Sequence, residues 1–241
     1  MFSLVAAIVL TTVACSSDSS SDEVNYTFVS KTEKPNWQVD LSGNEALPTW
    51  QDPAQSENYM YLTVKLQDEL VPYSTNDDRM ATFRDDECCS IVSHPSKHDD
   101  GSIYFVLKIH GNTTKIDLLT LKYYSGGLHQ IFSMNREIPF IADYSFGGDE
   151  YDLIPPLITG CKKYPVYTEY DTAKLQLPAE ATDDDLIGAF VGSECRGVCK
   201  PGNTLTILGL LDGEQAELRY YNAAKGGIYT FKEKVQISNN Q

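Results

Sequence analysis

Residues 78–88 read DRMATFRDDEC, and residues 185–195 read DLIGAFVGSEC. In both stretches an apolar run is followed by two turn residues and a second short run, a pattern that predicts a β-hairpin. When the stretches are aligned, four of the eleven positions are identical: Asp78/Asp185, Phe83/Phe190, Glu87/Glu194 and Cys88/Cys195. Further on, LKYYSGGLHQIF is echoed by LRYYNAAKGGIYTF. We infer an internal duplication.

The register of the second hairpin follows from its turn. Gly192-Ser193 suits a two-residue turn, because glycine adopts the positive φ that a type II′ turn requires at its first position. Pairing outward sets Val191 opposite Glu194, Phe190 opposite Cys195, Gly188 opposite Gly197 and Leu186 opposite Cys199. One face then carries Leu186, Phe190, Cys195 and Cys199, and we expect this face to lie in the core. The same rule pairs Phe83 with Cys88 and Arg84 with Glu87 in the first hairpin, so the shared Phe and Cys are predicted to be packing residues.

Outside these hairpins, short apolar runs recur between turn residues, and we find no convincing helical period. The expected strands are 61–66, 79–84, 87–92, 103–110, 116–124 and 128–133 in a first set, and 173–177, 186–191, 194–199, 204–210, 216–222 and 228–237 in a second. This pattern predicts an all-β protein made of two tandem Ig-like antiparallel β-sandwich units. We place the units at residues 36–143 and 163–241, joined by a Gly- and Pro-rich connector at 144–162. Trp37 and Trp50 are expected to cover the end of the first sandwich.

The N-terminus has the pattern of a targeting signal. Residues 1–14 are apolar and uncharged, which suits a signal peptide and is too short to span a bilayer. The sequence Thr12-Val13-Ala14-Cys15 resembles a bacterial lipobox, which implies a lipid on Cys15, although an ordinary cleavage site has the same small residues. Residues 15–35 are predicted to be a flexible tether. Its acidic start resembles the export signal of surface-displayed Bacteroidota lipoproteins, which implies a lipid-anchored protein of the cell envelope, at the outer membrane and exposed on the surface.

The segment DDLIGAFVGSECRGVCKP at residues 184–201 resembles modules of uncharacterised Bacteroidota surface lipoproteins, which have the form D-x-I-G-A-F-V-G-x-E-C-R-G-V. The lead-in PTWQDP…YMYLTVKLQDELVP is similar too, so the resemblance covers most of residues 36–241. It implies tandem β-sandwich lipoproteins and names no activity. The first unit departs from the motif at Arg84-Asp85-Asp86 and Cys89-Ser90, so any role of Arg196 is not shared by both halves.

The charge balance limits the partners. The chain has 19 Lys and Arg against 34 Asp and Glu, a net charge of −15, which excludes a basic nucleic-acid binder and a polybasic membrane-surface protein. We find no spacing typical of a catalytic triad, a phosphate loop or a cofactor site. HPSKHDDG at residues 94–101 could ligate a metal and the acidic turns could bind calcium, but polar loops explain both, and we predict no metal and no cofactor. Five cysteines are expected to be free thiols, with a Cys161–Cys199 disulfide left open.

Two tyrosine pairs, Tyr123-Tyr124 and Tyr220-Tyr221, supply the candidate ligand site. Neighbours on a strand point to opposite faces, so one tyrosine of each pair should be exposed, and exposed tyrosines suit sugar stacking or a protein interface. Together with Arg196 they are the predicted ligand-binding residues. The sequence therefore predicts a non-enzymatic, lipid-anchored envelope protein that binds a glycan or a protein ligand. The alternative is a structural or accessory subunit of a surface assembly, fimbria-like or part of an export complex, joined by strand addition.

Overall fold

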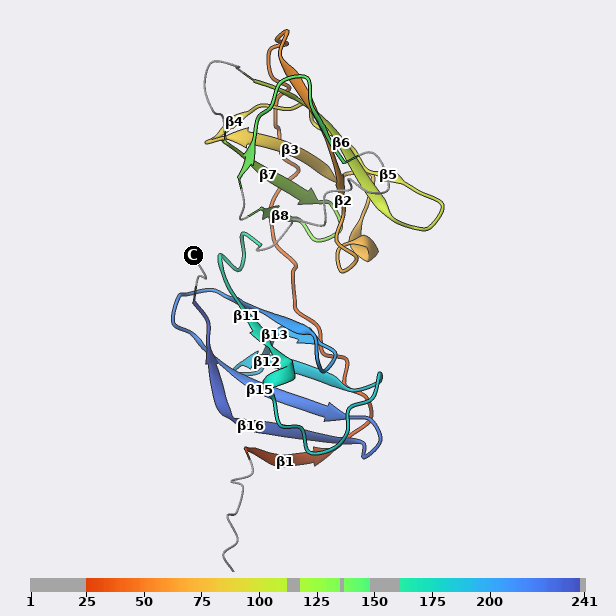
Figure 1. Cartoon of the computed structure of the whole chain (residues 1–241), viewed down its shortest axis with the longest axis vertical. Coiled ribbons are helices and arrows are strands. Elements are labelled where there is room, and N and C mark those ends of the chain that lie inside the picture. Colours follow the sequence, from red (N-terminus) through yellow and green to blue (C-terminus); the bar gives the residue numbers. More distant parts are fainter. Residues whose placement is uncertain (1–24, 112–117, 135–136, 148–160, 239–241) are drawn as a thin grey trace, which may run out of the picture.

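The computed structural model describes residues 25–111, 118–134, 137–147 and 161–238, and their regular structure is almost entirely β (Figure 1). The exceptions are two short 3-10 turns, η1 (Val71–Tyr73) and η2 (Thr172–Lys174). Within these ranges, no helix is long and apolar enough to cross a membrane. The predicted all-β fold with antiparallel sheets is confirmed.

The strands form two groups, which lie one above the other along the long axis of the molecule (Figure 1). In the first group, a sheet of order β10-β2-β6-β5 packs against a sheet of order β4-β3-β7-β8, in which β9 also pairs with β7. The strands are β2 (Tyr59–Lys65), β3 (Arg79–Arg84), β4 (Glu87–Cys88), β5 (Ser96–Lys97), β6 (Ile103–His110), β7 (Leu118–Ser125), β8 (Gln130–Ser133), β9 (Ile138–Pro139) and β10 (Ser145–Phe146). Alternate residues of β2 and β6 point inward and are fully buried or nearly so, which places the core between the two sheets.

The second group contains a sheet of order β1-β16-β15-β12-β13 and a two-stranded sheet, β11-β14. The strands are β1 (Tyr26–Lys31), β11 (Val166–Asp171), β12 (Leu186–Val191), β13 (Glu194–Cys199), β14 (Thr204–Gly209), β15 (Gln215–Asn222) and β16 (Gly227–Gln236). The core residues between the sheets include Ile187, Ala189, Leu205, Ile207 and Leu218.

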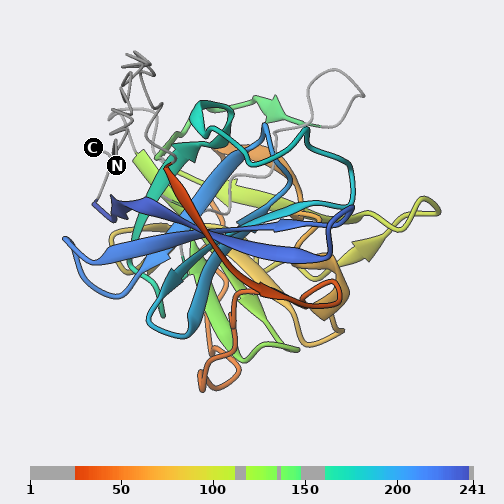
Figure 2. The ribbon, with the colours of Figure 1, turned by 90° about the horizontal axis from the view of Figure 1, so that it is seen from below.

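Three sequence-based boundaries are wrong. The predicted tether at 15–35 contains β1, which pairs antiparallel with β16 and so belongs to the second group (Figure 2). The predicted connector at 144–162 contains β10, which pairs with β2, and both Cys161 and Tyr164 lie in the first core. The predicted strand 173–177 is replaced by the turn η2 and an irregular segment, while β11 lies just before it.

The predicted hairpin pairs next to the turns are confirmed: Val191 with Glu194, Phe190 with Cys195, and Phe83 with Cys88. Beyond them the register shifts, because Ala189 pairs with Gly197 and Gly188 with Val198, which makes Arg196 the extra residue of a β-bulge. The predicted pairs of Gly188 with Gly197 and of Leu186 with Cys199 are therefore wrong.

The predicted core face of this hairpin is right only for Cys199, which packs against the core, whereas Leu186, Phe190 and Cys195 are not part of it. Ile187 and Ala189 point into the core, whereas Phe190 lies on the opposite face of the sheet and is covered by Trp37. Phe83 is likewise covered by Trp50 on the first group. Trp50 covers the first group as expected, but Trp37 covers the second. Both belong to residues 32–58, between β1 and β2, which we call the N-terminal arm, and this arm crosses the second group before it reaches the first.

Candidate ligand-binding pocket

All four tyrosines of the predicted ligand site are buried, which overturns the expectation that two of them face solvent. Their side chains are between 0% and 5% exposed: Tyr123, Tyr124, Tyr220 and Tyr221. The alternation of side chains along a strand shows which residues lie on the outer face of a sheet but not what covers that face. For Tyr124 it is covered by the N-terminal arm and a turn, because its hydroxyl lies 3.5 Å from the Glu45 carbonyl oxygen and 3.4 Å from His129 Nδ1.

Tyr123 and Tyr220 are the partners of two buried carboxylates. The Tyr123 hydroxyl donates to Asp78 Oδ2 at 2.8 Å, and the Tyr220 hydroxyl donates to Asp185. Burial raises the pKa of both phenols, and the neighbouring carboxylate raises it further, so each tyrosine stays a neutral donor. Because the aspartates accept bonds from their own chain, these acidic turns act as structural anchors of the sheets.

Arg196 is 2% exposed, and its side chain contacts other residues of the protein. Its guanidinium lies 3.1 Å from Glu194 and 3.4 Å from Glu214, and it sits 5.0 Å above the ring of Tyr164. A side chain with these partners is not available to a ligand, so the predicted binding role of Arg196 is not supported.

The residues weighed for metal binding have other contacts. His98 stacks on Tyr104 with ring centroids 4.3 Å apart, and Asp100 accepts hydrogen bonds from Ser102, which lower its pKa. Across the described ranges, no three His, Cys, Asp or Glu side chains gather as a metal site would require. The cysteines in these ranges are free thiols, so the Cys161–Cys199 disulfide is not formed, while Cys15 lies outside them.

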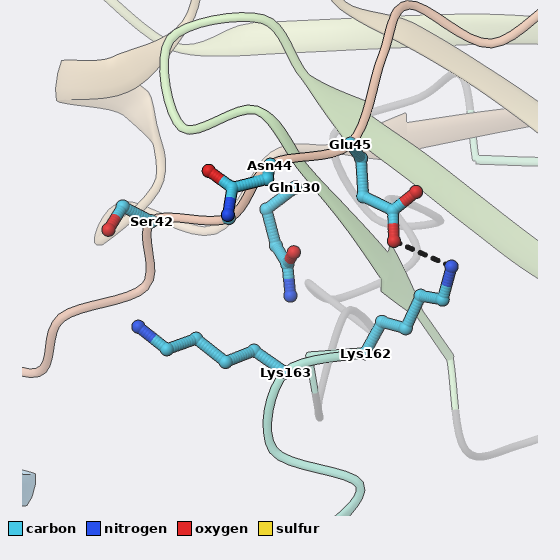
Figure 3. A pocket seen from close by; sticks show the side chains of 7 residues that line it. Ser42, Asn44, Glu45, Gln130, Lys162 and Lys163 are labelled. Carbon is cyan, nitrogen blue, oxygen red and sulfur yellow. Dashed lines mark hydrogen bonds and ion pairs between the residues drawn. The ribbon is translucent and has the colours of Figure 1, made fainter.

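A polar pocket of about 460 Å³ opens beside the edge of β8 (Figure 3). Two separate segments cover this edge. The Gly43 and Glu45 amides donate to the carbonyls of Leu128 and His129 at 2.8 Å, and the Lys162 amide donates to Ile131 at 3.1 Å. The pocket lies between the two segments, and its lining comes from three distant parts of the chain: Ser42, Gly43, Asn44, Glu45, Gln130, Lys162 and Lys163.

The side chains of the pocket are held in place by their neighbours. Gln130 is 3% exposed, and its Nε2 donates to Cys161 Sγ at 2.7 Å. A Cβ at residue 43 would collide with the Gln130 carboxamide, so the close approach of the arm requires glycine. The pocket is therefore preorganised by backbone pairing on both sides of Gln130.

Each ammonium group of the pocket has a carboxylate partner. Lys162 Nζ lies 2.6 Å from Glu45 Oε1, and Lys163 Nζ lies 3.0 Å from Asp40 Oδ2. Hydrogen bonds from Ser42 and Lys163 lower the pKa of Asp40 to about 2. Figure 3 shows Asn44 and Gln130 between the two lysines. The pocket is thus lined by donors and acceptors and is close to neutral in total charge.

A second pocket, of about 420 Å³, lies around Trp50, which meets Phe83 edge-on at 5.2 Å while Lys122 sits 4.5 Å above the Phe83 ring. The same contact recurs in the second group, where Trp37 meets Phe190 at 5.3 Å and Arg219 lies 4.2 Å above that ring. Because the same contact occurs in both groups, we interpret Trp50 as a packing residue that stabilises the fold and not as a ligand-binding residue.

The residues of the polar pocket were not predicted as a site from the sequence. Gly43-Asn44-Glu45 and Lys162-Lys163 stand out only as short polar segments, and 117 residues separate Glu45 from Lys162. Comparison of the chain with models of protein families, with curated proteins and with solved structures returned no match.

Proposed function

We propose that this chain is a non-enzymatic, lipid-anchored cell-envelope protein that binds a glycan ligand in the pocket around Gln130. The observation that carries the proposal is a preorganised pocket of about 460 Å³ with a polar lining from three chain segments. This volume lies within the range of small-molecule sites. A fixed set of donors and acceptors suits a ligand of the same character.

The chemistry of the lining favours a neutral saccharide. Sugar hydroxyls both donate and accept hydrogen bonds, and the pocket offers ammonium donors, a carboxylate acceptor and the amides of Asn44 and Gln130. Because Glu45 and Asp40 offset the two lysines, an ionic ligand gains little net attraction there.

The same pairing argues for binding and against catalysis. A general acid or base works best when its pKa lies near the working pH. The pKa of Asp40 is about 2, and Glu45 is held in an ion pair with Lys162. The low pKa of Asp40 makes this carboxylate a poor general base at neutral pH.

A glycan array with the full chain, followed by calorimetry on the best ligand, tests this function. Asn44→Ala and Lys163→Ala should each weaken binding at least tenfold, since each removes a lining group. Lys34→Ala is the matched control, because Lys34 forms a comparable ion pair with Asp184 at 3.1 Å on the second group. Blank results on the array and on a panel of host-matrix proteins, or equal loss in all three variants, would contradict the proposal.

The lipid anchor on Cys15 is tested separately. The wild-type chain should incorporate labelled palmitate and fractionate with membranes, whereas Cys15→Ala should do neither. A Cys15→Ala protein that remains with the membrane fraction would refute the anchor without bearing on the pocket.

The alternative, a subunit of a surface assembly, rests on β1. This strand forms the edge of its sheet, and Phe28 and Val29 are 51% and 56% exposed. An exposed apolar edge can accept a strand from another chain. Concentration-dependent oligomers that Val29→Lys abolishes would favour assembly; a monomer at all concentrations would argue against it.

We further propose that the two groups are Ig-like units that arose by duplication. Shared contacts support this idea: each group has a buried Asp bonded to a Tyr hydroxyl, a Phe paired with a Cys, and a Trp and a cation packed on that Phe. The two Trp residues are the exception to this correspondence, because Trp37 and Trp50 both lie in residues 32–58, between β1 and β2.

A further inference from the structure

The outward face of β2 and β6 has an unusual composition. The residues that point away from the core pair across the two strands in the order Tyr59 with His110, Tyr61 with Lys108, Thr63 with Val106, and Lys65 with Tyr104. We call these eight residues the acid-free strip, because none of them is Asp or Glu in a chain that has 34 acidic residues and a net charge of −15. The strip therefore differs in charge from the protein as a whole.

The centre of the acid-free strip is open to solvent, while two of its end residues are covered. Tyr104 is 9% exposed beneath His98, and His110 is 6% exposed, with its Nδ1 accepting a hydrogen bond from the Ser56 amide at 3.1 Å. In the middle, Tyr61 is 39% exposed and Val106 is 55% exposed. A ligand could thus reach the central rings directly.

The central side chains are ordered by one another. The rings of Tyr59 and Tyr61 meet edge-on at 5.7 Å, and Lys108 Nζ lies 4.4 Å above the ring of Tyr59. Within the described part of the chain, no carboxylate lies within 4 Å of Lys108. Lys65 has two acidic neighbours, Asp68 at 3.9 Å and Asp100, whose pKa it helps to lower, so Lys108 is the cation of the strip with the fewest acidic partners. The strip thus combines a fixed aromatic surface with cations that have weak partners or none among the described acids.

We propose that the acid-free strip binds a polyanionic polysaccharide. Tyr61, with Tyr59 beside it, stacks on the sugar rings, and Lys108 and Lys65 contact carboxylate or sulfate groups. This inference goes beyond the proposed function, because it concerns a different surface from the pocket around Gln130 and a ligand of opposite charge character.

The position of the strip in its sheet favours a polysaccharide over an acidic peptide. β2 and β6 pair with each other along their whole length, and the short strands β10 and β5 cover part of their outer edges, so the strip itself offers side chains and no free backbone to a ligand. What remains for recognition is a flat surface of rings and ammonium groups. Such a surface suits a chain of sugar rings laid across it.

The net charge of −15 does not prevent this contact at physiological salt. At an ionic strength of about 0.15 M, charges farther apart than roughly 8 Å are largely screened from each other. The charges next to the ligand therefore decide the sign of the interaction.

The test measures binding of the full chain to polygalacturonate, heparin and dextran at physiological salt. Dextran is the neutral reference, and the two anionic polymers separate carboxylate from sulfate recognition. We expect binding to at least one polyanion, no binding to dextran, a loss of at least tenfold in Lys108→Ala and in Tyr61→Ala, and near wild-type binding in Lys108→Arg.

Two matched controls guard against general effects. Lys122→Ala removes another cation that lies over an aromatic ring, 4.5 Å above Phe83, and Tyr73→Ala removes another tyrosine of similar exposure, 37%. Both variants should bind like the wild type. Lys163→Ala, in the pocket, should also keep polyanion binding, so failure of the strip and failure of the pocket are told apart.

Three results would overturn the proposal: dextran bound as tightly as the polyanions, no loss of binding in Lys108→Ala, or no binding to either polyanion. Equal binding of poly-glutamate with the same dependence on Lys108 would also overturn it, because the strip would then be a general receptor for anions or acidic proteins. Thermal unfolding of each variant shows whether it is folded. If Lys108→Ala is not folded, Tyr61→Ala decides, because unchanged binding in a folded Tyr61→Ala protein would overturn the proposal.

Discussion

Asp185 keeps its charge although it is fully buried. Burial alone would raise the pKa of its carboxyl group, but hydrogen bonds from Tyr220, from the Ala223 amide and from Thr182 outweigh burial, and the pKa lies below its usual value. The folded protein therefore stabilises the ionised form of Asp185 more than the unfolded chain does.

The first prediction concerns pH. Because the folded pKa of Asp185 is depressed, its contribution to stability is present above the unfolded pKa of about 4 and is lost as the pH falls through the lower folded pKa. Denaturant unfolding between pH 3 and 7 should show the free energy of unfolding falling on the acid side. Asp185→Asn should cost about 2–3 kcal/mol at pH 7 and flatten this dependence. Asp184→Asn, at an exposed neighbour, should behave like the wild type; equal curves for all three proteins would contradict the prediction.

The second prediction compares the two buried tyrosines. Tyr123→Phe and Tyr220→Phe each remove the hydroxyl that donates to a buried carboxylate, Asp78 or Asp185. Each change should lower the free energy of unfolding by about 1–3 kcal/mol. If the groups are duplicated units, the two costs should be similar when measured by denaturant unfolding. Tyr144→Phe, at a ring that is 49% exposed, should cost nothing measurable.

At the scale of single elements, the N-terminal arm contacts both groups through a tryptophan: Trp50 packs on the first group and Trp37 on the second. The third prediction is that Trp37→Ala loosens β12, β15 and β16, whereas Trp50→Ala loosens β3 and β7. Each ring covers a Phe and is itself only half-buried, so we expect about 1–3 kcal/mol for each change, less than for a fully buried Trp. Amide hydrogen exchange read strand by strand is the measurement. Loss of protection in the same strands in both variants would show that the arm acts on the molecule as a whole.

Strands that carry their own pattern were predicted well from the sequence. Four of them, β3, β6, β12 and β13, begin and end at the predicted residues, because turn residues flank each of these short runs. β1 was missed for the opposite reason. Its sequence YTFVSK follows a polar segment, and its partner lies far away in the chain, since Tyr26 pairs with Phe231.

The candidate sites were harder to predict than the strands. The pocket around Gln130 needs three segments that meet only through backbone pairing, which leaves no local pattern. The tyrosine pairs gave the wrong answer, because a period-two rule identifies opposite faces but not what covers each face. For the acid-free strip the signal was present: YMYLTVK alternates from Tyr59 to Lys65, with every polar or aromatic residue on one face.

At the scale of the whole molecule, Tyr164 joins the two strand groups. Its ring is buried in the first core, and its hydroxyl lies 2.5 Å from Glu194 Oε1 in β13 of the second group. Leu208 of β14 also packs against the first core. The groups are thus joined by side-chain packing as well as by the chain itself.

The fourth prediction follows from this junction. Tyr164→Ala should let the groups move apart, so the radius of gyration measured by small-angle X-ray scattering should increase. Tyr164→Phe keeps the ring, loses the bond to Glu194 and should have a smaller effect. Tyr144→Ala, at an exposed ring, is the control. Unchanged scattering in the folded Tyr164→Ala protein would show that Tyr164 does not hold the groups together.

The pairing of β1 with β16 also sets the order in which the chain can fold. β1 is synthesised about 200 residues before β16, so it cannot pair until residues beyond 226 exist. Contacts of such long separation form slowly, since the loop between them must close first. The strands of the first group all lie between β1 and β16 in the chain, so this group can fold before β1 pairs, and we expect β1 to be the last strand to join its sheet.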